Sequence, residues 1–175
     1  MITIDGYFEG PGNDISWHNV DAKFNEYAID QLNSASALIF GRKTYELMAS
    51  YWPTDAALQD DAVVARMMNS LPKVVFSKTL KEVTWSNTRL YNNELKKVCN
   101  ELKSGNKKDI FVFGSADLAS DMIKLNLIDE FRFIISPIVL GDGRRIFGPD
   151  SGVLKMKLER TKVFQSGNVL MVYGP

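Results

Sequence analysis

The sequence predicts an α/β fold with a central mixed, mostly parallel sheet that antiparallel C-terminal strands complete at one edge. Three short apolar runs predict strands covered on both faces, as in a parallel sheet: ALIF (Ala37–Phe40), KVVF (Lys73–Phe76) and IFVF (Ile110–Phe113). Segments with helical periodicity alternate with these runs, which favours parallel strands joined by helices. The last third of the chain has strand patterns with no helix between them, which is typical of antiparallel strands.

Four segments have the apolar spacing of amphipathic helices. They are Asp21–Asn33, Ala56–Asn69, Asn93–Lys103 and Ser115–Leu125. In the last of them Ala119, Met122 and Ile123 fall on one face, and Asn126 is a suitable residue to end the helix. These helices are expected to cover the sheet.

The C-terminal strands are expected at Glu130–Leu140, Leu154–Phe164 and Asn168–Tyr173. Gln165-Ser166-Gly167 is a plausible hairpin turn between the last two. Pro137 cannot donate a ladder hydrogen bond, so it indicates a bulge or an edge position in the first of these strands. Because there is no repeat, low-complexity segment or long linker, residues 1–175 are expected to form a single domain.

Composition narrows the function classes. The formal net charge is +0, so no global field would attract nucleic acid or an anionic membrane. The single cysteine excludes an intrachain disulfide, and the single histidine argues against a histidine-based metal site, so no metal is expected. Neither a signal peptide nor a membrane-spanning apolar run is recognisable, which predicts a cytoplasmic protein.

Three strand ends carry residues that suit anions. Gly41-Arg42-Lys43-Thr44 follows the first apolar run, Ser77-Lys78-Thr79 follows the second, and Gly114-Ser115-Ala116 follows the third. Ligands of open α/β sheets bind beyond the carboxyl ends of the strands, and helix N-termini offer free N–H groups to phosphates. Together the three turns suit a ligand with more than one phosphate. Alone, the first turn is equally compatible with an ordinary helix start and the third with a tight strand-to-helix turn. Ser77-Lys78-Thr79 alone is more often an ordinary turn.

Nucleophilic catalysis has little support, and no catalytic residue is assigned. The sequence contains neither a Walker A motif nor Gly-x-Gly-x-x-Gly, so a nucleotide would be bound by another scheme. His18 lies in a loop without a Ser or Cys signature, and Asp60-Asp61 is typical of a solvated helix face. The residues favour binding and positioning of a cofactor that carries the chemistry.

Five blocks of the sequence, in order, resemble the C-terminal reductase domain of riboflavin biosynthesis, the RibD C-terminal family of dihydrofolate reductase-like proteins. They are IDGYFEGPGNDISWH (Ile4–His18), LIFGRKTYE (Leu38–Glu46), KVVFSKTL (Lys73–Leu80), IFVFGSADLASDMI (Ile110–Ile123) and IDEFRFIISPIVLGDGRRIF (Ile128–Phe147). Small stand-alone bacterial members are most similar. The resemblance implies a three-layer α/β/α fold, NADPH as cofactor, a small-molecule substrate and commonly a homodimer.

By position, the resemblance also implies roles for individual residues. The residues implied to bind the cofactor are, for the adenosine phosphates, Gly41, Arg42, Lys43 and Thr44; for the 2′-phosphate, Ser77 and Lys78; and for the pyrophosphate, Gly114, Ser115, Ala116 and Leu118. Pro137 and Ile138 are implied to lie by the nicotinamide end, with Leu140 and Gly141 near the cofactor channel. Asp5, Gly6 and Trp17 are implied to wall the substrate pocket. A 2′-phosphate site favours NADPH over NADH.

The chain also departs from the family pattern. The apolar strand before Asp5 is short, which affects part of the nicotinamide wall. Asn25 stands near the position of the acidic residue of folate reductases and cannot act as an acid, and Glu26 could serve only in a register shifted by one, so folate reduction is not expected. Arg144 and Arg145 could supply charge for a phosphate, but neighbours on a strand face opposite ways. A proton could come from water or from a loop acid such as Asp5, Glu9 or Asp14.

Three hypotheses follow. The first is an NADPH-dependent reductase that transfers a hydride to a pyrimidine- or pteridine-like heterocycle, as in 5-amino-6-(5-phosphoribosylamino)uracil reduction. The second is a non-catalytic nucleotide-binding or scaffold protein that keeps the fold. The third is an interaction domain that binds no nucleotide.

Overall fold

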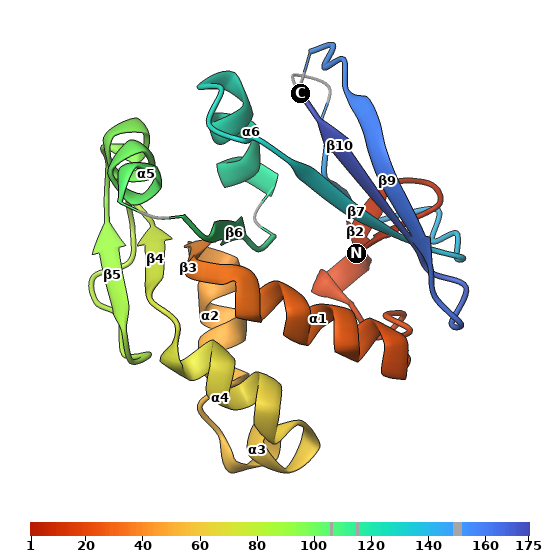
Figure 1. Ribbon diagram of the computed structural model, residues 1–175, viewed down its shortest axis with the longest axis horizontal. Helices are drawn as coiled ribbons and strands as arrows, with labels where there is room; N and C mark the ends of the chain where they lie inside the picture. Colours follow the sequence, from red (N-terminus) through yellow and green to blue (C-terminus); the bar gives the residue numbers. More distant parts are fainter. Residues whose placement is uncertain (106, 115, 149–151) are drawn as a thin grey trace. The chain divides into compact units, whose positions relative to one another are not determined.

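The computed structural model describes residues 1–105, 107–114, 116–148 and 152–175, and these residues form two compact units. Unit 1 combines the two ends of the chain, Met1–Glu26 and Ile128–Pro175, and unit 2 is the continuous segment Tyr27–Leu127. Figure 1 shows the elements of both units along the chain. That the whole chain forms one domain stays a prediction.

Unit 2 contains a four-stranded sheet in which every neighbouring pair is parallel, in the order β5-β4-β3-β6. Its strands are β3 (Ala35–Gly41), β4 (Lys73–Phe76), β5 (Thr88–Tyr91) and β6 (Asp109–Val112). The three apolar runs are therefore confirmed as strands of one parallel sheet. The sequence analysis missed β5, because its four residues TRLY carry polar side chains and no apolar run.

The helices alternate with these strands. They are α1 (Ala22–Ser34), α2 (Arg42–Tyr51), α3 (Asp55–Asp60), α4 (Ala62–Ser70), α5 (Leu95–Ser104) and α6 (Ala116–Lys124). The helix expected over Ala56–Asn69 is divided at Asp61, whose carboxylate accepts hydrogen bonds from Val63 N (3.1 Å) and Val64 N (3.0 Å). Because this carboxylate caps α4, one helix begins where the other has ended.

The core of unit 2 lies against β3 and β4. Leu38, Phe40 and Val75 are completely buried, and Tyr45 and Trp85 pack in the same cluster. Burying a side chain of this size contributes roughly 1.5–3 kcal/mol, so these strands anchor the turns that follow them. None of the helices in the part of the chain described here is long and apolar enough to cross a membrane.

Unit 1 contains a mixed four-stranded sheet in the order β1-β7-β10-β9. Its strands are β1 (Ile2–Thr3), β7 (Phe131–Ser136), β9 (Lys157–Val163) and β10 (Val169–Gly174). Strand β1 is parallel to β7, whereas β10 is antiparallel to both of its neighbours. The antiparallel C-terminal strands are thus confirmed. Over the described residues they share a sheet with β1, so the strands expected in one mixed sheet are divided between two.

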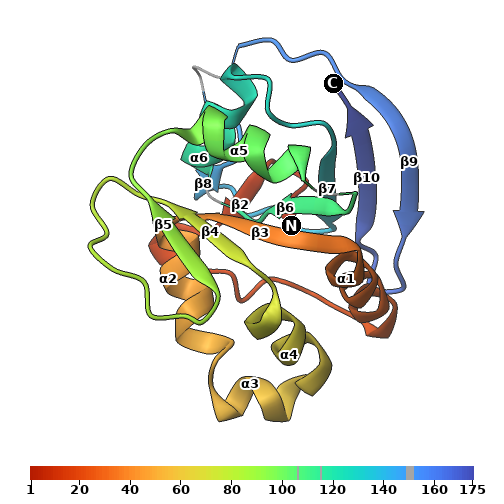
Figure 2. The same ribbon diagram turned by 60° about the vertical axis from the view of Figure 1, so that its left-hand side comes forward.

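A second, two-stranded sheet joins the ends of the chain within unit 1. Strand β2 (Tyr7–Glu9) pairs with β8 (Arg144–Arg145), and a 3₁₀ turn, η1 (Pro11–Asn13), follows β2. The β9–β10 hairpin, visible along its length in Figure 2, turns at Gly167 with a φ of 86°. This confirms the predicted turn. Pro137 follows the last residue of β7, so it ends the strand and does not form a bulge.

Candidate functional site

The register of the parallel sheet brings the three predicted phosphate turns to one edge of unit 2. Gly41 at the end of β3 is paired with Phe76 at the end of β4. On the other side of β3, Phe113 N donates to Ile39 O at 3.1 Å, a distance typical of a ladder hydrogen bond. Because all these strands run in the same direction, the turns that follow them leave the sheet side by side.

Two of these turns touch each other. Gly114 has a φ of +59°, and a Cβ at this position would lie 3.1 Å from Thr44 Oγ1. A side chain here would be strained by the backbone and crowded by the threonine. The glycine therefore lets the turn after β6 approach the start of α2. Ser115, which was predicted to bind the pyrophosphate, lies outside the described residues.

The N-terminus of α2 is open to an anion. Gly41 is its N-cap and supplies no capping side chain, and no acidic residue occupies the first turn. Arg42 Nη1 is 2.9 Å from the Glu46 carboxylate, in an exposed pair. Such a pair is worth about 0.3–0.5 kcal/mol, so Arg42 can turn to a phosphate at little cost. Lys43 is exposed beside it.

The remaining predicted residues of unit 2 have mixed surroundings. Ser77 Oγ accepts hydrogen bonds from Leu80 N (2.9 Å) and Thr79 N (3.2 Å), so the hydroxyl organises its own turn. Lys78 is exposed. Ala116 and Leu118 are buried in α6, whereas Asp117, the acidic residue of its first turn, is exposed.

Unit 1 brings the predicted substrate turn onto the predicted nicotinamide segment. Asp5 Oδ2 accepts from Gly141 N at 2.8 Å, and Oδ1 accepts from Leu140 N at 3.3 Å. Nearby, Ile4 N donates to Ile138 O at 3.0 Å. The structure therefore joins Ile4 and Asp5, next to Gly6 in the chain, to the segment that contains Pro137, Ile138, Leu140 and Gly141.

The Asp5 carboxylate is an anion held by internal donors. Thr3 Oγ1 donates to Asp5 Oδ1 at 2.6 Å, and Thr3 in turn accepts from Tyr7 N at 2.9 Å. The Thr3 hydroxyl, followed by the Gly141 and Leu140 amides, holds the pKa of Asp5 below its usual value. Asp5 is consequently a poor proton donor, and its visible role is to fix the turn.

Trp17 and His18 lie in the loop after η1. Trp17 Nε1 donates to Asp14 O at 3.2 Å, and the two rings are in edge contact with centroids 4.5 Å apart. Burial lowers the pKa of His18 to about 4. His18 is therefore uncharged at neutral pH. Its Nε2 has no hydrogen-bond partner among the described residues.

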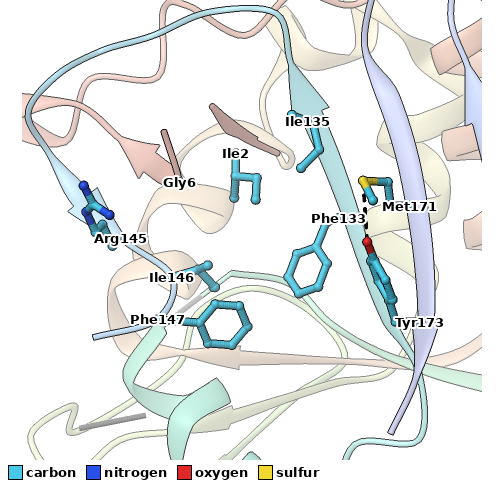
Figure 3. A pocket seen from close by; sticks show the side chains of 9 residues that line it. All are labelled: Ile2, Gly6, Phe133, Ile135, Arg145, Ile146, Phe147, Met171 and Tyr173. Carbon is cyan, nitrogen blue, oxygen red and sulfur yellow. Dashed lines mark hydrogen bonds between the residues drawn. The ribbon is translucent and has the colours of Figure 1, made fainter. Parts of the chain in front are cut away.

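The sequence analysis missed a pocket of about 210 Å³ on one face of the mixed sheet of unit 1. Figure 3 shows the side chains around it. The lining residues are Ile2, Gly6, Phe133, Ile135, Arg145, Ile146, Phe147, Met171 and Tyr173. Alternation in the β7 sequence FRFIIS could have indicated that Phe133 and Ile135 share a face. The pairing with β10 could not be read from that pattern.

Arg144 and Arg145 contact different groups. Arg144 Nη1 is 3.7 Å from Glu9 Oε1, and its guanidinium lies 5.6 Å from the centre of the Phe8 ring. Arg145 lies over the Tyr7 ring at 4.6 Å and lines the pocket. Only the second arginine is therefore available to a molecule in that pocket.

Comparison with known proteins relates the whole chain to one family. Residues 1–172 match the RibD C-terminal domain family. Uncharacterized protein YyaP of Bacillus subtilis (strain 168) is 33% identical over 172 residues, which cover 98% of this chain and 90% of that protein. The family match confirms the resemblance that the sequence motifs indicate.

Solved structures confirm the α/β fold class. A putative riboflavin biosynthesis protein from Shewanella sp. PV-4 aligns with a TM-score of 0.75 and 22% identity, covering 99% of this chain and 94% of that chain. A diaminohydroxyphosphoribosylaminopyrimidine deaminase/5-amino-6-(5-phosphoribosylamino)uracil reductase from Thermotoga maritima aligns with a TM-score of 0.67 and 16% identity. That alignment covers 99% of this chain and 54% of the Thermotoga chain.

Proposed function

Because this chain belongs to the RibD C-terminal domain family, we propose that it is an NADPH-dependent reductase of a small heterocycle. The substrate would be pyrimidine- or pteridine-like, as in the reduction of 5-amino-6-(5-phosphoribosylamino)uracil. The observation that carries the proposal is the contact between Gly114 and Thr44, because it joins two phosphate-type turns at the carboxyl edge of a parallel sheet.

The residues of unit 2 fit the phosphates of NADPH. The first-turn N–H groups of α2 have no capping side chain, and Arg42 and Lys43 add positive charge. The left-handed backbone at Gly114 keeps the neighbouring turn free of a Cβ. Ser77 and Lys78 would hold the 2′-phosphate. Ser77 can donate its hydroxyl hydrogen while its oxygen still accepts the turn amides.

The residues of unit 1 would position the reacting groups. The segment containing Pro137, Ile138, Leu140 and Gly141 would lie at the nicotinamide end. Asp5 would hold this segment through its bonds to the Leu140 and Gly141 amides. Trp17 would form a wall of the substrate site. Bound NADPH would supply the hydride.

Water is the proton source that we favour. Hydrogen bonds, first from Thr3 to Asp5 and from Ser16 to Asp14, hold the pKa of both carboxyls below the usual value. Glu9 faces Arg144 at 3.7 Å. The Asp5 and Asp14 carboxyls therefore lie in surroundings that favour their anions. We also propose that the protein acts as a cytoplasmic homodimer and binds neither nucleic acid nor a membrane.

The same observation favours a second candidate, a nucleotide-binding protein without turnover. If the loop acids cannot donate a proton and water is excluded, the cofactor would bind and the hydride would not be transferred. The two candidates share the cofactor site and differ only in activity.

Titration of the purified chain with NADPH and with NADH, followed by nicotinamide fluorescence, tests the shared site. We expect NADPH to bind at least about tenfold more tightly, since a 2′-phosphate adds charge-assisted hydrogen bonds. Arg42→Ala should weaken both cofactors through loss of a phosphate contact, whereas Lys78→Ala should weaken NADPH more than NADH. Lys81→Ala, at an exposed lysine beyond the turn, is the charge-matched control.

The outcomes separate the hypotheses. Binding followed by oxidation of NADPH with a pyrimidine or pteridine substrate supports the reductase. Binding without oxidation of NADPH across such substrates supports the nucleotide-binding protein. If neither dinucleotide binds, the cofactor site is refuted and the interaction domain is favoured.

A further inference from the structure

We propose that the pocket of unit 1 binds a small planar aromatic anion, such as a one-ring carboxylate, with its anionic group on Arg145. The pocket lies wholly within unit 1, so this proposal does not depend on NADPH binding. Apart from Gly6, it concerns residues to which the proposed reductase assigns no role.

The walls of the pocket suit a single flat ring. Phe133 and Phe147 meet edge to face with centroids 5.8 Å apart, and Tyr173 lies 6.1 Å from Phe133. Ile2 and Ile135 add an aliphatic surface from the paired strands β1 and β7. Aromatic walls favour offset or edge-on contact with another ring. Figure 3 shows these side chains gathered around the cavity.

The volume of the pocket suits one ring with a small substituent. The cavity measures about 210 Å³. An apolar cavity of about 150 Å³ is large enough for benzene. The remaining space fits a carboxylate.

The charge of the pocket selects an anion. Arg145 is the only charged residue among the nine that line the cavity, and it is exposed. No carboxylate of the described residues lies within ion-pair distance of it, in contrast to Arg144. A guanidinium with free N–H groups can bind both oxygens of a carboxylate.

The guanidinium is already oriented. It lies over the Tyr7 ring at 4.6 Å, and Nη2 donates to Tyr7 Oη at 3.2 Å. Tyr7 belongs to β2, which pairs with the strand of Arg145. A preorganised cation loses less conformational freedom on binding than a mobile one. The pocket therefore combines flat apolar walls with a fixed positive group at one side.

The test is a titration of the ¹⁵N-labelled full chain with benzoate, benzamide and cyclohexanecarboxylate at millimolar concentrations, followed by NMR. We expect benzoate to shift the amides of the pocket-lining residues and to bind about tenfold more tightly than benzamide or cyclohexanecarboxylate. Benzamide keeps the planar ring and lacks the charge. Cyclohexanecarboxylate keeps the charge and lacks the planar ring.

Two variants assign the contacts. Arg145→Gln should reduce benzoate binding about tenfold, to the level of benzamide, because only the charge is lost. Phe147→Ala should weaken benzoate and benzamide alike. Arg89→Gln, on β5 in unit 2, removes an exposed arginine and is expected to change nothing. Arg145 is exposed, so its replacement is not expected to impair folding.

The proposal is overturned if benzoate shifts no pocket amide, if benzamide binds as tightly as benzoate, or if Arg145→Gln binds benzoate like the wild type. Should Phe147→Ala fail to fold, the comparison of benzoate with cyclohexanecarboxylate on the wild type still decides whether the ring is recognised. Failure of NADPH binding would leave this result unaffected.

Discussion

At the scale of single residues, Lys73 shows how a charge can be buried without a carboxylate. The side chain is 1% exposed, and Nζ donates to Met68 O (2.8 Å), Asn69 O (3.1 Å) and Leu71 O (2.7 Å). These carbonyls lie at or just beyond the last turn of α4, where the helix dipole favours a cation. The ring of Trp85 lies 4.5 Å from the same atom. Lys73 therefore joins strand β4 to the end of α4.

Replacing Lys73 with Met should lower the free energy of unfolding by about 3 kcal/mol, because three carbonyls at the end of α4 would lose a charged donor. Urea denaturation measures this change, and an unchanged m-value would show that the unfolding transition is otherwise the same. Lys81→Met, at an exposed lysine of the same unit, should change stability by less than about 0.5 kcal/mol. Equal effects of the two substitutions would contradict the role given to Lys73.

At the scale of elements, the β2–β8 pair depends on a close approach of two backbones. A Cβ on Gly143 would lie 2.2 Å from Glu9 O and 3.0 Å from Gly10 Cα, and the φ of Gly143 is +138°. Both contacts are with backbone atoms, which cannot rotate away. Only glycine lets the segment before β8 pass β2 at this distance. This contact joins sequence positions near the two ends of the chain.

Gly143→Ala should therefore lower the free energy of unfolding by about 3 kcal/mol, through crowding and backbone strain. Thermal and urea unfolding would measure the loss, and NMR should show the largest shifts at Tyr7, Phe8 and Glu9. Gly148→Ala is the matched control, since a Cβ there meets nothing within 4 Å. If Gly143→Ala were as stable as Gly148→Ala, β2 and β8 could not be paired as described.

At the scale of the whole molecule, the chain builds one continuous and one discontinuous unit. Unit 2 is a single stretch, whereas unit 1 needs both ends of the chain, because β1 pairs with β7 and β2 with β8. Its sheet can form only after residues far apart in sequence have met. Contacts between residues so far apart in sequence slow folding, because the long intervening segment must be closed into a loop before they can form. We expect the folding of unit 1 to require both of its segments, and therefore the entire chain.

The pH dependence of stability is also a property of the whole molecule. The protein's one histidine dominates this dependence over a defined range of pH. The pKa of His18 is about 4 in the folded protein because of burial, against 6.5 as its ordinary value. Between these values the unfolded chain binds a proton that the folded protein does not bind. The free energy of unfolding therefore falls as the pH is lowered from 6.5 to 4.

His18→Gln removes this proton and should flatten the dependence. Between pH 6 and pH 4.5 we expect the wild type to lose about 1 kcal/mol per pH unit more than the variant. Urea unfolding at a series of pH values measures both curves. Parallel curves would mean that His18 titrates alike in the folded and unfolded states. The lowered pKa values of Asp5 and Asp14 act at lower pH and are common to both proteins.

The sequence by itself determined the α/β class, most of the strands and helices, and the turns that follow the three apolar strands. These features follow from local patterns: apolar runs for β3, β4 and β6, helical spacing for α1 and α6, and glycine after the strands. The ordered motifs also carried the family resemblance. Local interactions suffice for such features because each depends on residues that are close in sequence.

Only the tertiary structure decided which of these residues meet. Strand register brings Thr44 against Gly114 and Asp5 against Gly141, and neither contact has a signature in the local pattern. Lys73 looks like a strand residue in sequence and is a buried helix cap in three dimensions. The pocket around Arg145 likewise combines β1, β7, β10 and the segment after β8. Contacts between distant segments depend on how whole elements pack, which no short stretch of sequence encodes.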